Sequence, residues 1–197
     1  MKDTRSPSFL EQARAVIALE MEALSILSKN LDPASFDDVV EALWSSKGNV
    51  VLTGLGKPYF IAQKVAASLA STGTPAIAMH PVDALHGDMG RLRAGDVVVL
   101  LSNSGATQEI LNFARALDAV GVVRIAVSCQ TDSPLGLLCE HSLGLGAIDE
   151  ADELGLAPTS SSLAMLSLGD ALMVVLARRR GFDRASFAHL HPGGQLG

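Results

Sequence analysis

Small polar side chains gather directly after five consecutive apolar residues in the stretch VVVLLSNSGATQE. Ser102, Ser104 and Thr107 offer hydroxyl donors, Asn103 offers an amide, and Gly105 lets a ligand approach the backbone closely. A helix that starts near Thr107 aims free backbone N–H groups at the same place. The pattern favours a site for phosphate or a similar anion. Its alternative is a helix cap without a ligand, although four small polar residues in six positions exceed what one cap needs.

A second glycine-rich turn, TGLGKPY, follows another apolar run and contains Gly56 and Lys57. It is neither a P-loop nor a dinucleotide-binding fingerprint, because the required spacing and the third glycine are absent. Lys57 is therefore either a solvated surface lysine or a cation beside a turn at a strand end. Open α/β sheets bind their ligands at such strand ends.

Several acids and histidines are further candidates. Glu109 lies in the first turn of its predicted helix, where the helix dipole favours an acid in any case. Glu150 lies in the acidic segment AIDEADELGLAPTSSS, which is either solvated or functional. His80 ends the second apolar run, and His86 and His191 lie in glycine-containing segments without helical periodicity. For these histidines a structural role and a catalytic role both remain open.

The elements that position these residues alternate along the chain. Short, continuously apolar runs predict parallel strands covered on both faces, and amphipathic helices lie between them. This alternation predicts a doubly wound α/β sheet. The expected strands are Asn49–Gly54, Ala76–His80, Asp96–Ser102, Val123–Ser128 and the weaker His141–Gly146. The expected helices are Ser8–Lys29, Pro33–Ser46, Tyr59–Ser71, Thr107–Val120, a short one near Ser133–Cys139, and Ser160–Arg180.

Length and composition exclude several classes of protein. A chain of 197 residues predicts one domain, with N-terminal helices over residues 8–46 and an α/β core over 47–197. A net charge of −6 argues against a nucleic-acid binder. The longest apolar run, Leu163–Ala177, is interrupted by Asp170, so no membrane span is expected. The N-terminus lacks a secretion-signal pattern, and Cys129 and Cys139 suit free thiols, which together predict a cytoplasmic protein.

Five segments carry a resemblance to a known family: TGLGK, ASTGTPAIAMHPVDALHGDMG, LLSNSGATQEI, LGLAPTSSSLAMLSLGDALMVVL and FAHLHPGGQLG. Together they resemble the sugar isomerase (SIS) domain and its arabinose-5-phosphate isomerase branch, which interconverts D-ribulose 5-phosphate and D-arabinose 5-phosphate for Kdo synthesis. The resemblance runs from about residue 8 to Gly197. It implies a flavodoxin-like three-layer αβα sandwich around a five-stranded parallel sheet. It also implies a homotetramer whose sites combine residues from more than one subunit.

The resemblance also assigns roles to residues. It places the family's phosphate loop on Ser102, Asn103, Ser104 and Thr107, which we call the hydroxyl cluster. It places the catalytic lysine on Lys57, beside Gly56. The two catalytic acids fall on Glu109 and Glu150, and the C-terminal histidine falls on His191. No metal is required, and no redox or organic cofactor is expected.

Four further positions match parts of the family's site. His80 and His86 correspond to active-site histidines near which the family can bind an inhibitory metal. Ser71 and Thr72 correspond to a turn close to the sugar.

The sequence departs from the family in three places, one of which is Ala106, where members often have Glu. GKPY replaces the usual GKSG, so Pro58 removes a backbone N–H next to Lys57 and Tyr59 replaces a small residue. The paired CBS domains that most members carry after the HPGG motif are absent from the sequence, which stops at Gly197.

Aldose–ketose isomerisation through an enediolate needs a base, a cation or donor for the developing oxyanion, and a remote handle that supplies binding energy. The hydroxyl cluster suits the handle and Lys57 the cation, while Glu109, Glu150 and His191 are candidates for the base. Two alternatives remain: an isomerase of another sugar phosphate, and a SIS domain that binds a sugar phosphate without turnover.

Overall fold

The computed structural model describes residues 6–193 and contains one five-stranded parallel sheet with the strand order β2-β1-β3-β4-β5. This is the doubly wound order, in which the direction of strand addition across the sheet reverses between β1 and β3. The predicted fold class is therefore confirmed. The strands are β1 (Val50–Gly54), β2 (Ala76–Ala78), β3 (Val97–Leu101), β4 (Val123–Ser128) and β5 (His141–Gly144).

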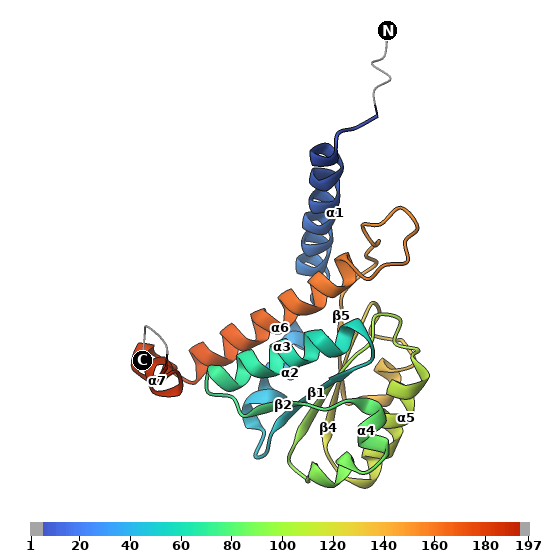
Figure 1. Ribbon diagram of the computed structural model, residues 1–197. Coiled ribbons are helices and arrows are strands. Elements are labelled where there is room, and N and C mark those ends of the chain that lie inside the picture. Colours follow the sequence, from blue (N-terminus) through green and yellow to red (C-terminus); the bar gives the residue numbers. More distant parts are fainter. Residues whose placement is uncertain (1–5, 194–197) are drawn as a thin grey trace.

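Helices cover both faces of the sheet and complete a three-layer αβα sandwich (Figure 1). One apolar core lies between the sheet and α2, α3 and α6, and the other lies between the sheet and α4 and α5. The α-helices are α1 (Phe9–Asn30), α2 (Pro33–Ser45), α3 (Lys57–Ser71), α4 (Pro81–Leu85), α5 (Gln108–Ala116), α6 (Ser160–Arg179) and α7 (Arg184–Leu190). Short 3₁₀ turns are η1 (Asp88–Arg91), η2 (Leu117–Ala119) and η3 (Gly136–Leu138).

The central strand β3 shows why the strands are apolar throughout. All five of its residues are buried. Val98 and Leu100 point toward α4 and α5, whereas Val99 and Leu101 point toward α3 and α6. A strand with helices on both faces has no solvent side, which removes the alternation of polar and apolar residues.

Helix α1 projects away from the body of the molecule (Figure 1). A capping box between Ser8 and Glu11 starts it, and its buried residues are Ala23 and Leu27, both in its second half. Large apolar side chains stay exposed over the rest of the helix, namely Phe9, Leu10, Val16, Ile17, Leu19 and Met21. Such a row of apolar side chains is typical of a protein interface.

Helix α6 is long and apolar enough by composition to cross a membrane, the one such helix among residues 6–193. It instead packs on α3, where Gly169 lies against Val65, and on α1 and α2. Its Asp170 forms an ion pair with Lys64 of α3. About half of its most apolar stretch, 44%, is buried in this chain, so the helix retains an apolar face toward the outside.

Two predicted helices are corrected. The helix expected over Thr107–Val120 ends at Ala116 and continues as the 3₁₀ turn η2. The helix expected near Ser133–Cys139 is only the 3₁₀ turn η3, because the Ser133 hydroxyl accepts the Gly136 N–H and so competes with helical hydrogen bonding. Helices α4 and α7 were not predicted, since five and seven residues are too few for a periodic signal.

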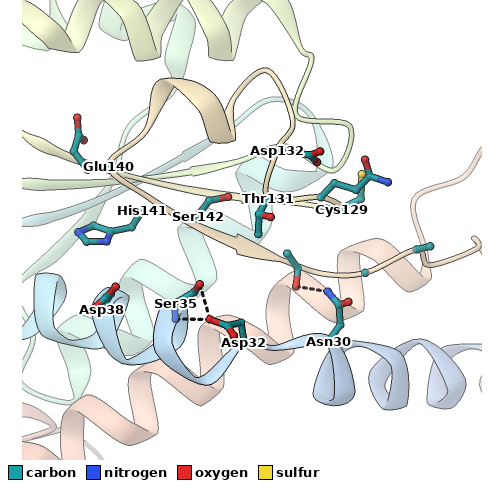
Figure 2. Close-up of a pocket in the computed structure, with 14 residues that line it drawn as sticks. Asn30, Asp32, Ser35, Asp38, Cys129, Thr131, Asp132, Glu140, His141 and Ser142 are labelled. Carbon is teal, nitrogen blue, oxygen red and sulfur yellow. Dashed lines mark hydrogen bonds between the residues drawn. The ribbon is translucent and has the colours of Figure 1, made fainter.

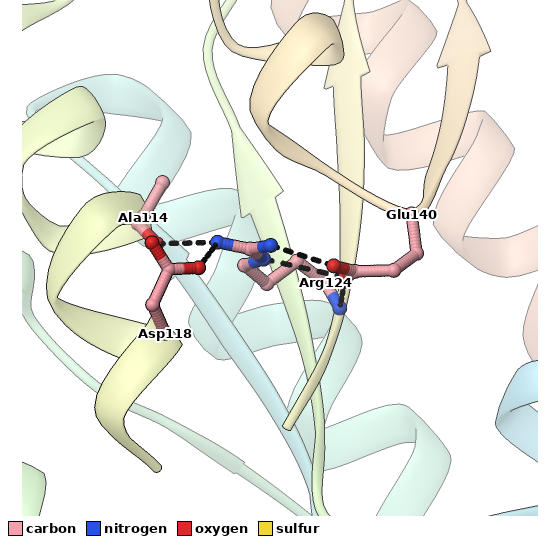
Figure 3. Close-up of polar contacts among 4 residues, drawn as sticks. All are labelled: Ala114, Asp118, Arg124 and Glu140. Atoms are coloured by element: carbon pink, nitrogen blue, oxygen red, sulfur yellow. Dashed lines mark hydrogen bonds and ion pairs between the residues drawn. The ribbon is translucent and has the colours of Figure 1, made fainter. Parts of the chain in front are cut away.

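A partly buried arginine ties the ends of three elements together (Figure 3). The guanidinium of Arg124 on β4 donates to Asp118 and to the Ala114 carbonyl, at 2.5 and 3.1 Å. It also donates to Glu140 at 2.6 Å, and the Arg124 backbone N–H adds a bond to the same carboxylate at 2.7 Å. Burial raises the pKa of Glu140, but its bonds to Arg124 outweigh this and hold the pKa below the ordinary 4.5.

Replacing Arg124 by methionine is expected to lower the free energy of unfolding at pH 7 by about 1–3 kcal/mol. The Glu140 contribution is complete above pH 4.5 and is lost as the pH falls through its lowered pKa, so the difference from the parent shrinks in acid. Urea unfolding at pH 7 and pH 4, at one protein concentration, measures this. Arg91→Met, which breaks an exposed pair with Asp88, serves as the control and is expected to cost less than about 0.5 kcal/mol. Equal losses in both variants contradict the prediction.

Candidate active site

The two glycine-rich turns lie side by side at the point where the strand order reverses. Gly54 at the end of β1 is in register with Leu101 at the end of β3. Neighbouring strands are about 4.8 Å apart, so the Lys57 turn and the hydroxyl cluster are direct neighbours. This is the place where doubly wound sheets bind ligands.

The hydroxyl cluster forms a tight turn over residues 102–107, at the start of α5, which we call the hydroxyl turn. Ser102 is buried, and its hydroxyl lies 3.0 Å from that of Thr107. Thr107 occupies the N-cap position of α5, yet its side chain makes no capping hydrogen bond. The N–H groups of the first helical turn therefore remain available to an anion. Gly105 adopts a φ of +62°, a conformation that turns the backbone toward the helix.

The N-terminus of α3 faces the same edge of the sheet. Gly56 is the N-cap with a φ of +66°, and α3 also has no side-chain cap. Lys57 is the first helical residue and is exposed. Tyr59 contacts His80 edge to face, with ring centroids 4.9 Å apart. The residue that departs from the family pattern thus packs on a predicted site histidine.

A cleft of about 720 Å³ opens beside the hydroxyl cluster on the α3–α6 side of the sheet. Its walls come from the ends of β1 and β3, the start of α6 and the loop between β5 and α6. Among the predicted residues, the lining contains Ser102, Asn103, Ser104, Thr107 and Glu150. Pro58 lines it as well, whereas the exposed Lys57 before it does not.

Glu150 occupies the N-terminus of α6. Its carboxylate accepts hydrogen bonds from the Thr159 N–H at 2.8 Å, the Thr159 hydroxyl at 3.1 Å and the Ser161 N–H at 3.2 Å. The Ser161 hydroxyl donates to its other oxygen. Glu150 therefore caps the helix from outside while it lines the cleft. Thr159 and Ser161 were not predicted from the sequence, although the segment PTSSS before an apolar helix is an N-terminal signal.

Two substitutions separate the cap from the chemistry. Glu150→Ala is expected to lower the free energy of unfolding by about 1–2 kcal/mol, because it removes the cap of α6. Glu150→Gln keeps an acceptor oxygen and most of that stability, but it cannot take a proton, so turnover falls about 10²- to 10⁴-fold. Thermal unfolding and initial rates on both variants measure this. A Glu150→Gln enzyme with parental turnover leaves Glu150 as a cap alone.

The remaining predicted residues are distributed differently. Glu109 is exposed in the first turn of α5 and lies outside the lining of the cleft. His86 is exposed at the end of α4. His80 precedes α4, beside β1, because Met79 donates its N–H to Leu52 of β1.

Three predicted residues lie at the opposite edge of the sheet. Ser71 ends α3 and Thr72 follows it, one helix length away from Lys57. His191 follows α7, beyond the far end of α6, a helix of 20 residues that spans about 30 Å (Figure 1). His191 stacks on Phe187 and bonds its carbonyl at 2.8 Å. Within one chain these residues are not brought to the cleft. The end of the HPGG motif, from Gly194 onward, lies outside the described residues.

A second cavity, of about 770 Å³, lies between β5 and the α1–α2 junction (Figure 2). Asp32 and Asp38 line it from α2, and His141 and Ser142 line it from β5. Carboxylates line both this cavity and the cleft at the reversal point, but none of the predicted site residues lines this cavity, whereas the hydroxyl cluster lines the cleft. The cleft at the reversal point is therefore the candidate for an anionic ligand.

Known proteins resemble this chain over almost its whole length. Arabinose 5-phosphate isomerase KdsD of Pseudomonas aeruginosa is 41% identical over all 197 residues, which cover 60% of its length. Arabinose 5-phosphate isomerase KpsF of Escherichia coli O6:H1 is 37% identical over 98% of this chain and 59% of its own. The chain thus spans about three fifths of the length of these relatives.

A solved structure also resembles this chain closely. A protein of E. coli CFT073, in complex with arabinose 5-phosphate, superposes with a TM-score of 0.90 and 37% identity, covering 98% of this chain and all of that one. The model of the SIS domain matches residues 42–175, which include the whole sheet and both glycine-rich turns. From its sheet, its turns and this match, the chain belongs to the SIS-domain family.

Proposed function

We propose that this protein is an aldose–ketose isomerase that interconverts D-ribulose 5-phosphate and D-arabinose 5-phosphate. The observation that carries the proposal is an uncapped hydroxyl turn beside Lys57 at the reversal point of a SIS domain. The names of its relatives, and the arabinose 5-phosphate bound in a similar structure, support the choice of substrate.

The reaction removes a proton from C2 of the aldose, forms the C1–C2 enediolate and returns a proton to C1, while a hydroxyl proton passes from O2 to O1. The substrate phosphate binds the hydroxyl turn and the first turn of α5, which fixes the sugar for the chemistry. Lys57, one strand away, stabilises the negative oxygen of the enediolate. Glu150 is the base, since it lines the same cleft as the turn. Glu109, His86 and His191 are further groups for ring opening and proton return.

The direct test is incubation of the purified protein with ribulose 5-phosphate and identification of the product. Formation of arabinose 5-phosphate, at a higher rate than the isomerisation of hexulose 6-phosphate substrates, supports the proposal. Binding of the sugar phosphate without turnover favours a sensor, for which the rigid Pro58 beside Lys57 is the relevant feature.

We also propose that the protein is a homotetramer with sites shared between subunits. The exposed apolar side chains of α1 and the outer face of α6 supply surface for contacts between copies. The proposal explains how His191 and Thr72, remote from the cleft of their own chain, contribute to a site on a neighbouring copy.

Mixing two inactive variants tests the shared site. Lys57→Met and His191→Ala subunits, unfolded and refolded together in equal amounts, are expected to regain about a quarter of the parental activity, because one site in four receives both intact residues. Separately refolded variants mixed afterwards serve as the control. Mass measurement verifies that the refolded mixture contains heteromers. If these heteromers regain no activity, the site does not combine Lys57 of one subunit with His191 of another, and the shared site is wrong.

We further assign the protein to the cytoplasm and to the supply of arabinose 5-phosphate for Kdo and lipopolysaccharide synthesis, in line with the names of its relatives. Cell fractionation and complementation of a strain that lacks arabinose 5-phosphate isomerase test this assignment.

A further inference from the structure

Two buried serines lie behind the hydroxyl turn, on the side away from the cleft. Ser128 ends β4 and Ser133 lies in the loop that follows, and their hydroxyl oxygens are 2.9 Å apart. Both residues are buried, with exposures of 0% and 7%. Neither lines the cleft.

The donors in this pair are fixed by its neighbours. Ser128 has one hydroxyl hydrogen and donates it to the Gln130 carbonyl at 2.8 Å. Ser133 must therefore donate to Ser128. Ser133 in turn accepts the Gly136 N–H at 3.1 Å. The result is a continuous chain of buried hydrogen bonds, which holds the loop 129–136 in one shape.

This loop braces the hydroxyl turn from behind. The Cys129 N–H donates to the Asn103 carbonyl at 2.8 Å, and the Leu135 N–H donates to the Gly105 carbonyl at 2.9 Å. Gly105 also lies so close to Ser133 that a Cβ on Gly105 would overlap the Ser133 side chain. The turn and the loop are thus fitted to one another through backbone bonds and direct packing.

We propose that Ser133, paired with Ser128, is a positioning residue that holds the hydroxyl turn in the shape that binds phosphate. This inference rests on the proposed function only in taking that turn as the phosphate site. Ser133 does not touch the ligand. Its effect passes through the loop to the carbonyls of Asn103 and Gly105, which lie in the same peptide planes as the N–H groups of Ser104 and Ala106, just before α5.

The test compares affinity with turnover in Ser133→Ala. The Gly136 N–H loses its acceptor and Ser128 loses its donor, so the loop relaxes away from the turn. The KM for arabinose 5-phosphate is expected to rise about tenfold, which corresponds to about 1.4 kcal/mol, with kcat changed less than twofold. Calorimetry with arabinose 5-phosphate and with inorganic phosphate is expected to show the same loss of affinity, independently of turnover.

Three further variants keep the test decisive. Ser142→Ala removes a hydroxyl that is buried without a partner among residues 6–193, so its KM is expected to equal that of the parent. Ser128→Ala keeps the hydrogen bond from the Gly136 N–H to the Ser133 hydroxyl. It replaces Ser133→Ala in the affinity measurements if Ser133→Ala does not fold. The Ser128→Ala/Ser133→Ala double variant is expected to lose little more affinity than Ser133→Ala, because the pair acts as one unit.

The outcomes separate the inference from the proposed function. A parent protein that binds both ligands but does not isomerise the sugar overturns the proposed function. In that case the affinities of the serine variants for the two ligands still decide the positioning role of Ser133. Serine variants with lower thermal stability but parental KM and affinity overturn the positioning role alone. A parent that binds neither ligand overturns both.

Discussion

Replacing Lys57 by methionine is expected to lower kcat for arabinose 5-phosphate about 10²- to 10³-fold, as is found when one donor to a developing oxyanion is lost. Lys57 begins α3 at the reversal point, one strand from the turn proposed to bind the phosphate. In the proposed mechanism the positive end of α3 and the Lys57 ammonium both stabilise the enediolate oxygen. Since neither is part of the hydroxyl turn, KM is expected to change less than about threefold.

Lys64→Met is the matched control for this substitution. Lys64 lies two turns further along α3 and pairs with Asp170 of α6 on the surface, so its loss removes the same charge without reaching the cleft. Turnover within twofold of the parent is expected. Lys57→Arg keeps the positive charge but places it on a planar guanidinium instead of a compact ammonium. This variant is therefore expected to retain only part of the parental kcat. Parental turnover in Lys57→Met rules out the proposed cation.

Local patterns predicted the fold well where one helix or strand has one consistent environment. Strand β3 is buried on both faces and is apolar throughout, so its sequence indicates a central parallel strand without any knowledge of its neighbours. The turn after it was also predictable, because Ser102, Gly105 and Thr107 have the chemistry of an anion site in the sequence itself. The strand order then brings this turn beside that of Lys57.

The features of the fold and of the candidate site that could not be predicted from the sequence depend on tertiary contacts. The cap that Glu150 provides for α6 joins residues nine to eleven positions apart through a loop whose path no pattern specifies. A helix was predicted near Ser133–Cys139, but the hydrogen bond from the Gly136 N–H to the Ser133 hydroxyl accompanies only a 3₁₀ turn there. His191 and Thr72 lie across the sheet from the cleft, and only an assembly of several chains could bring them to it.

The hydroxyl turn leaves no room for a side chain at Gly105. Gly105→Ala is expected to lower the free energy of unfolding by about 2–4 kcal/mol. About 1 kcal/mol comes from placing a side chain at a φ of +62°, and the rest comes from overlap of the new Cβ with Ser133. Because relief of this overlap pushes the turn away from the loop 129–136, arabinose 5-phosphate affinity is expected to fall more than about tenfold.

Gly121→Ala separates these two contributions. Gly121 has a similar φ of +75°, but a Cβ there meets nothing within 4 Å, so only the conformational cost of about 1 kcal/mol is expected. Urea unfolding and calorimetry with arabinose 5-phosphate on both variants measure the difference. If both variants lose the same stability and both keep parental affinity, Gly105 is needed only for its backbone angle, and close packing against Ser133 does not shape the phosphate turn.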